Sequence, residues 1–90
     1  MDFSFDPAKN VQNLEKHKLP LAFGVSVLMN MFGEVEDRRR DYGEKRMKAF
    51  ARLGGSWFQC TYTMRGTVAH IINVHRTSSR EMQKWLRLSE

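Results

Sequence analysis

The stretch from Arg46 to Arg80 carries basic and imidazole side chains but no carboxylate. Its six Lys/Arg residues could neutralise a phosphate, and His75 could carry a proton near neutral pH. Cleavage of an RNA phosphodiester without a metal requires these capacities, because a base must activate the 2′-hydroxyl while cations stabilise the charge on phosphorus. A metal-dependent route would need several converging carboxylates, and the nearest ones are Glu44 and Glu81. The stretch therefore predicts metal-independent chemistry on a polyanion, with no cofactor.

Other side chains could complete such a site. Arg46 could face a phosphate while Glu44 orients it or acts as a base, although the same two residues could form a surface ion pair of little consequence. His17 is expected at the end of a helix, where a cation is electrostatically favoured. It could transfer a proton, or it could bind a backbone carbonyl in a purely structural role.

Three more residues are candidates for binding RNA rather than for chemistry. Lys48 and Arg65 are cations of the basic half of the chain, with Arg65 at an expected turn. Tyr62 could stack on a base or donate its hydroxyl, although a strand tyrosine more often packs half-buried.

The composition is that of one soluble domain covering residues 1–90. Net charge is +5, and residues 46–90 hold eight bases against two acids. A basic half of this kind is typical of a polyanion-binding protein, although it could also be a solvated face. The lone Cys60, the absence of an apolar run of about 20 residues and the early acids Asp2 and Asp6 favour a cytoplasmic location without membrane attachment.

The first half of the chain predicts one strand and two helices. Residues 3–5 alternate as a strand does, and Asp6-Pro7 is a favourable start for a helix over 7–17. Ala8, Val11 and Leu14 give that helix an apolar stripe. Pro20 starts a second helix over 20–29 that is apolar nearly all round, and residues 30–44 are expected to form a loop with room for a short edge strand.

The second half predicts three strands and a helix. The strands cover 46–53, 56–64 and 67–75, joined by turns at Gly54-Gly55 and Arg65-Gly66, and a helix follows over 79–88. The order β-α-α-β-β-β-α indicates an α+β two-layer domain. We expect an antiparallel sheet with its helices packed on one face, which leaves the other face free for a ligand.

Several short motifs then occur in a characteristic order: Phe5-Asp6-Pro7-Ala8-Lys9, Asn13, Lys16-His17, Tyr42-Gly43-Glu44-Lys45-Arg46, Tyr62-Thr63-Met64-Arg65-Gly66, Ile71-Ile72-Asn73 and Arg76-Thr77-Ser78-Ser79-Arg80-Glu81. In these motifs the chain resembles the BrnT family of toxins from bacterial type II toxin–antitoxin systems. The resemblance implies a small RelE-like fold and ribonuclease activity. It also implies a DNA-binding antitoxin of the ribbon-helix-helix type, through which any contact with DNA would be indirect.

The resemblance also bears on individual residues. Arg76 and Arg80 match arginines of the family pattern, and Arg80 is expected in the first turn of the last helix, where free N–H groups also favour a phosphate. His17 matches a histidine of the pattern, whereas His75 stands where the family usually has arginine. These matches predict a catalytic set of Arg76, Arg80, Arg46, Glu44, His75 and His17.

The apolar helix over 20–29 is the expected antitoxin contact. Its circumference is too apolar for one buried stripe, so Phe23 and Val27 should hold either the core or the antitoxin. The alternative to a ribonuclease is a non-catalytic module that binds RNA or antitoxin. A DNA-binding regulator acting alone lacks support, because the sequence has no helix-turn-helix signature.

Overall fold

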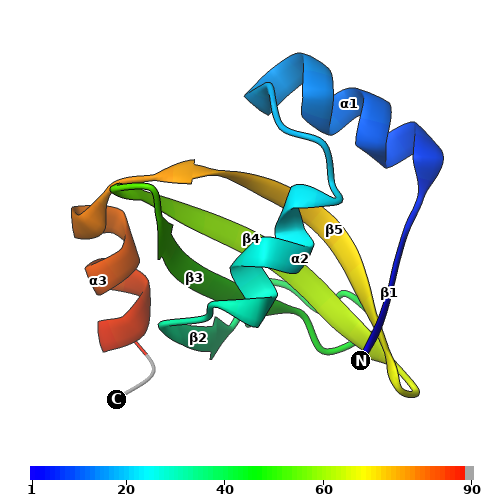
Figure 1. The fold of residues 1–90 in the computed structure, drawn as a ribbon. Coiled ribbons are helices and arrows are strands. Elements are labelled where there is room, and N and C mark those ends of the chain that lie inside the picture. Colours follow the sequence, from blue (N-terminus) through cyan, green and yellow to red (C-terminus); the bar gives the residue numbers. More distant parts are fainter. Residues whose placement is uncertain (89–90) are drawn as a thin grey trace.

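The computed structural model describes residues 1–88, so the predicted domain boundary at residue 90 lies outside the described residues. Figure 1 shows the chain as a strongly twisted sheet with helices around it. The elements are β1 (Asp2–Phe5), α1 (Pro7–His17), α2 (Phe23–Met29), β2 (Gly33–Glu36), β3 (Met47–Leu53), β4 (Ser56–Arg65), β5 (Val68–Thr77) and α3 (Ser79–Arg87).

Helix α1 has the predicted bounds because its ends are capped locally. The side chain of Asp6 accepts a hydrogen bond of 2.9 Å from the Ala8 N–H, and Pro7 occupies the first turn. At the other end Lys18 has φ +61°, and its N–H donates to the Leu14 carbonyl at 3.0 Å. A left-handed residue in this position ends a helix.

Helix α2 is shorter than predicted. The segment that begins at Pro20 forms a tight turn, in which the Phe23 N–H donates to the Pro20 carbonyl and the Gly24 N–H to that of Leu21. The helix proper begins at Phe23. Gly24 lets it approach the sheet closely, since a Cβ atom there would lie 2.9 Å from the Cys60 Sγ and 3.0 Å from Ile71.

The sheet is mixed, so the prediction of a purely antiparallel sheet is wrong. Its order is β1-β5-β4-β3-β2, and β1 lies parallel to β5 with Phe3 opposite Ala69. The alternation of residues 3–5 indicates a strand but says nothing of its direction. The edge strand β2 pairs with β3 and occupies part of the expected loop, so the order becomes β-α-α-β-β-β-β-α.

The helices do not share one face of the sheet, which corrects a second prediction. Ala51 packs in a core with Leu21 and Val27 on the α2 side, whereas the adjacent Phe50 packs with Met82 of α3. Neighbouring residues of a strand point to opposite faces, so α2 and α3 cover opposite faces. Alternation in the sequence separates the two faces without showing which helix covers each.

The predicted apolar stripe of α1 points outward. Val11 and Leu14 are 54% and 41% exposed, whereas Asn13 is buried. The Asn13 side chain donates to the Val74 carbonyl at 2.8 Å and accepts from the Val74 N–H at 3.1 Å. Helix α1 therefore docks on β5 by replacing a missing strand partner at the sheet edge, and it stands beside β5 in Figure 1.

We call the part of the α3-side face around Lys48, Thr61, Asn73 and His75 the open face; Asn73 and His75 are partly exposed there, whereas Lys48 and Thr61 are buried. Within residues 1–88 no helix is long and apolar enough to cross a membrane.

Candidate active site

The open face is lined by side chains that strand register brings into rows. Lys48 of β3 lies opposite Thr61 of β4, which in turn lies opposite Asn73 of β5. Paired residues share a face, so these three side chains form one row across the sheet. The row belongs to the α3 side because Phe50, two residues beyond Lys48, packs against α3. His75 extends the open face by one pair, opposite Gln59.

Arg46 stands at the start of β3 within a group of charges. Its Nε lies 3.6 Å from a Glu44 oxygen, and the same carboxylate lies 3.6 Å from the Arg65 Nη2. Both separations exceed a hydrogen bond, so these are loose ion pairs. The Arg46 guanidinium also stacks on the Tyr42 ring, 4.3 Å from its centroid. Glu44 therefore orients two cations while a face of Arg46 is fixed by the tyrosine.

The loop that carries Tyr42 and Arg46 is held by a buried carboxylate. Asp37 accepts two bonds of 2.9 Å from the Arg39 guanidinium and one of 3.0 Å from the Tyr42 hydroxyl. These bonds, those from Arg39 above all, lower the pKa of Asp37 well below its usual range. The Asp37 N–H also donates to the Arg46 carbonyl at 2.8 Å. Asp37 thus positions Arg46 in two ways: it holds Tyr42, on which the guanidinium stacks, and its N–H binds the Arg46 carbonyl.

Two histidines from distant parts of the chain meet beside this row. The rings of His17 at the end of α1 and His75 of β5 lie 4.9 Å apart between centroids. Burial lowers the pKa of His17, and the positive charges of His75 and Lys16 lower it further. The His75 Nδ1 lies 2.8 Å from the Arg76 carbonyl, so Nδ1 donates and Nε2 remains the basic nitrogen of a neutral ring.

Lys48 is a nearly buried cation. It is 6% exposed, and its Nζ lies 4.9 Å from the centroid of Trp85 in α3. The Arg39 guanidinium lies at the same distance from that ring. Burial lowers the pKa of Lys48, and the nearby charge of Arg39 acts in the same direction. An ammonium held in this way can bind a phosphate oxygen strongly, because little water competes for it.

A cleft of about 260 Å³ separates α1 from the open face. Its walls are polar and largely cationic, and they come from α1, β3 and β5: Lys9, Gln12, Asn13, Lys16, His17, Arg46, Ile72 and Asn73. The cleft thus brings the predicted residues His17 and Arg46 together with two lysines that the sequence did not single out as a site.

Other predicted site residues lie elsewhere. Arg76 pairs with Phe58 and its guanidinium lies 5.8 Å from that ring, on the α2 side of the sheet. Arg80 is exposed in the first turn of α3, beside Glu81 and Lys84. The structure therefore groups His17, His75, Arg46, Glu44 and Lys48 in one region, whereas Arg76 lies behind it and Arg80 on a neighbouring helix.

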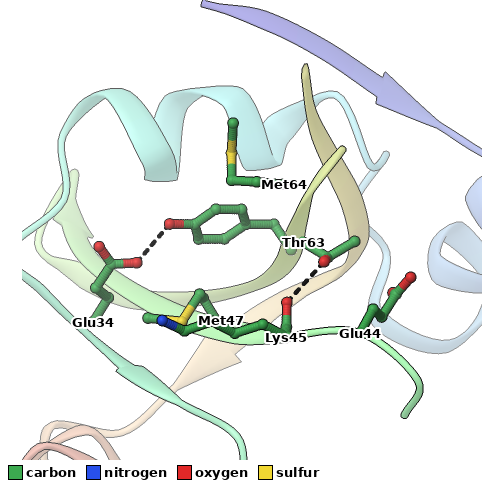
Figure 2. A pocket seen from close by; sticks show the side chains of 7 residues that line it. Glu34, Glu44, Lys45, Met47, Thr63 and Met64 are labelled. Carbon is green, nitrogen blue, oxygen red and sulfur yellow. Dashed lines mark hydrogen bonds between the residues drawn. The ribbon is translucent and has the colours of Figure 1, made fainter. Parts of the chain in front are cut away.

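Tyr62 also faces the α2 side, where it packs with Ala49 and Ala69. Its hydroxyl donates to Glu34 at 2.5 Å, a bond drawn in Figure 2, and burial followed by this bond raises its pKa. The ring lines a second cleft of about 480 Å³ together with Met47 and Met64. A tyrosine packed in this way is not presented to a ligand on the open face.

The two predicted antitoxin contacts differ in accessibility. Val27 is fully buried, so it can only hold the core, whereas Phe23 is partly exposed and packs edge-on against Phe58 at 4.8 Å. Cys60 is buried in the same core, and burial raises its pKa to about 12. The thiol is therefore a packing group of the core.

Comparison with known families decides the assignment of the chain. A family model described as the ribonuclease toxin BrnT of a type II toxin–antitoxin system matches residues 5–81. The chain belongs to the BrnT family. No curated protein matches it. Type II systems pair a toxin with a protein antitoxin, so a BrnT toxin has RNA as its substrate and a protein as its partner.

Sequence reasoning missed several residues that shape this BrnT site. Asp37 and Tyr42 position Arg46, Trp85 holds Lys48, and Thr61 and Asn73 form its floor. In a regular strand Thr61 shares a face with Trp57, four residues before it. No local signal connected α3 or the loop to that face, because those contacts are made across long sequence separations.

Proposed function

We propose that the chain is a cytoplasmic bacterial endoribonuclease that cleaves RNA on the open face without a metal. A cognate antitoxin of the ribbon-helix-helix type neutralises it. The family assignment supports the activity class. The observation that favours this location is the meeting of the His17–His75 pair with Arg46 and Lys48 on the open face.

The proposed reaction is an internal transfer. His17, the member of the pair whose pKa is lowered, takes the proton of the substrate 2′-hydroxyl, whose oxygen attacks phosphorus, and the P–O5′ bond breaks. His75, in its protonated form, gives a proton from Nε2 to the leaving 5′-oxygen, so the products are a 2′,3′-cyclic phosphate and a 5′-hydroxyl. The two rings lie 4.9 Å apart between centroids, and the positive charge of His75 lowers the pKa of His17, which favours a neutral His17 as the base.

The cations stabilise the charge that develops on phosphorus. Arg46 offers an N–H that has no hydrogen-bond partner, and Lys48 adds a poorly hydrated ammonium. Glu44 orients Arg46 from 3.6 Å and is the alternative base. Arg65 shares the Glu44 carboxylate and provides a further contact for the RNA backbone.

The roles of Arg76, Arg80 and Tyr62 stay predictions from the sequence. Arg80 could bind a phosphate on RNA that leaves the open face along α3. A role for Arg76 would require RNA to wrap around the end of β5. We therefore propose that the open-face group supplies the chemistry and that these residues act, at most, in binding.

The proposal is tested with purified, antitoxin-free protein and a fluorescent RNA in excess chelator. The RNA should be cut, and a substrate with one 2′-deoxy nucleotide immediately 5′ of the cut should resist. Cutting that needs added magnesium would overturn the metal-free mechanism. Normal cutting at the deoxy position would show that the substrate 2′-hydroxyl is not the nucleophile. RNA that is bound but never cut, with no arrest of growth on expression, would instead support the non-catalytic binding module.

The partner is tested separately. The gene next to this one should encode a short ribbon-helix-helix protein that copurifies with the chain and blocks RNA cleavage when added in equal amount. A neighbour without that pattern, or one that binds without inhibiting, would contradict the proposed antitoxin while leaving the nuclease intact.

A further inference from the structure

Three buried polar atoms of the open face lack a hydrogen-bond partner. Among residues 1–88 the buried side-chain atoms in this condition are the Arg46 Nε, the Thr61 Oγ1 and the Asn73 Oδ1. Buried polar groups in folded proteins are nearly always paired, so a group of three calls for an explanation. Their coincidence on one face, beside one cleft, indicates a ligand that supplies the missing partners.

The register places the atoms close to one another. Thr61 and Asn73 are a directly opposed pair of β4 and β5, and Arg46 and Asn73 both line the cleft beside α1. Thr61 does not itself line the cleft; it is 4% exposed, and its hydroxyl belongs to the floor of the face next to Asn73. By contrast, the neighbouring Thr63 hydroxyl is satisfied, because it donates to the Lys45 carbonyl at 2.7 Å.

The chemistry of the three atoms defines what they can bind. The Arg46 Nε only donates, the Asn73 Oδ1 only accepts, and the Thr61 hydroxyl does either. A nucleobase edge presents donors and acceptors side by side, and its phosphate would find Lys9 and Lys16 on the α1 wall of the same cleft. The volume of about 260 Å³ lies just below the roughly 300–1,000 Å³ of typical ligand pockets, which suits one nucleotide unit.

We infer that this cleft binds a single nucleotide of the RNA next to the scissile bond and reads its base through Asn73 and Thr61. The inference rests on the proposed function, because it deepens the substrate recognition of the same face. Arg46 joins the subsite to the reacting phosphate. The base preference of cleavage is therefore set by two neutral residues that carry no charge to the reaction.

The test separates base reading from cleavage. The probes are four 2′-fluoro hexanucleotides, one for each base, which lack the 2′-hydroxyl nucleophile, and their affinities are measured by fluorescence anisotropy. The full-length protein should prefer one base by roughly tenfold, the scale of one good base contact. Asn73→Ala and the nearly isosteric Thr61→Val should each reduce this preference to within about threefold, whereas Thr67→Val, in the exposed turn after β4, should leave it unchanged.

The contrary outcomes are equally clear. An unchanged preference in both variants, or no preference in the starting protein, would overturn the inference and assign the three atoms to ordinary hydration. The inference would also be overturned if the variants lose antitoxin binding while their affinities for the oligonucleotides are unchanged. The cleft would then be a contact for the protein partner. If the protein does not cut RNA but shows a base preference that the variants abolish, the nuclease proposal is wrong and the nucleotide subsite is retained.

Discussion

The two faces of the sheet are built from alternate residues of the same strands, yet they differ in almost every physical respect. On the α2 side Ala49, Ala51 and Ile71 are fully buried, and a helix lies across them. On the open face the intervening positions hold Lys48 and Thr61, which are sequestered by their strand neighbours and by Trp85 rather than by a packed apolar layer. Alternate residues of the same strands therefore stabilise the core on one face and provide polar groups for chemistry on the other.

The difference also explains where polar groups remain unpaired. Among residues 1–88, no buried side-chain nitrogen or oxygen of the α2 side lacks a hydrogen-bond partner. The open face buries three polar atoms without partners and brings cations beside them. Such an arrangement costs stability, since a buried unpaired group is unfavourable by about 1–3 kcal/mol. It is consistent with a face that is completed by its substrate.

The largest expected effect is the loss of stability caused by a substitution in the core on the α2 side. Val27→Asp places a carboxylate in the fully buried core and should destabilise the fold by about 4 kcal/mol or more, enough to unfold a small domain. Met29→Asp is the matched control on the same helix, because Met29 is 69% exposed. Urea melts should show loss of the folded baseline in the first variant and little change in the second. Equal stability of the two variants would contradict the assigned core.

A smaller effect tests the carboxylate that holds the Arg46 loop. Asp37→Asn weakens the bonds from Arg39 and Tyr42 and should cost about 1–2 kcal/mol, a modest value because the Arg39 side chain is 61% exposed. The pKa of Asp37 is lower in the folded than in the unfolded chain. Its contribution is therefore present above about pH 4 and is lost as the pH falls below that value.

Melts at pH 7 and pH 3 separate the two sources of this stability. The parent chain should lose more stability than Asp37→Asn between the two pH values, so that the difference between their stabilities is smaller at pH 3 than at pH 7. A constant difference across this range would show that the carboxylate charge is irrelevant to the loop.

The two threonines of β4 sharpen the contrast within the open face itself. Thr63→Val removes a satisfied hydrogen bond and leaves the Lys45 carbonyl unpaired, so it should cost about 1 kcal/mol. Thr61→Val removes an unpaired hydroxyl and should be neutral or slightly stabilising. Thermal melts of the two single variants provide the comparison. A large loss in Thr61→Val would mean that its hydroxyl has a partner in solution.

The smallest expected effect concerns salt. Lys16 lines the cleft, so Lys16→Ala should lower the slope of log affinity against log salt for a 2′-fluoro oligonucleotide by roughly 0.7. Lys18→Asn is the control, since asparagine tolerates the left-handed conformation at that position and Lys18 Nζ is bound to the Glu15 carbonyl. An equal reduction in both variants would indicate diffuse attraction instead of a contact in the cleft.

Local features of the fold could be predicted from the sequence. Asp6-Pro7 gave the start of α1, and Gly54-Gly55 gave the hairpin of β3 and β4, because each depends on a few neighbouring residues. The parallel pairing of β1 and the position of α3 could not be predicted, since they depend on contacts between distant segments. The predicted apolar stripe of α1 was wrong for the same reason. The helix docks through the buried Asn13, which binds the distant Val74, and Val11 and Leu14 are exposed.

The candidate site was predictable in its chemistry and less so in its geometry. Arg46, Glu44, His17 and His75 were identified by type and do converge. Arg76 was grouped with them because it matches an arginine of the family pattern, but it directly follows His75, and consecutive strand residues point to opposite faces. Thr61 lies in no motif, and the Ile71-Ile72-Asn73 motif gave Asn73 no binding role, so only their unpaired atoms reveal these two residues.

The most direct test of the account compares Arg46→Ala with Arg76→Ala in one assay of RNA cleavage by purified protein. Each variant removes one arginine, from the open face and from the α2 side respectively, and thermal melts establish that both are folded. The account predicts that Arg46→Ala lowers the cleavage rate by roughly one to two decades, the loss of a charge-assisted phosphate contact, whereas Arg76→Ala stays within about threefold of the parent. Cleavage abolished by Arg76→Ala and retained by Arg46→Ala would contradict it and move the active site to the end of β5.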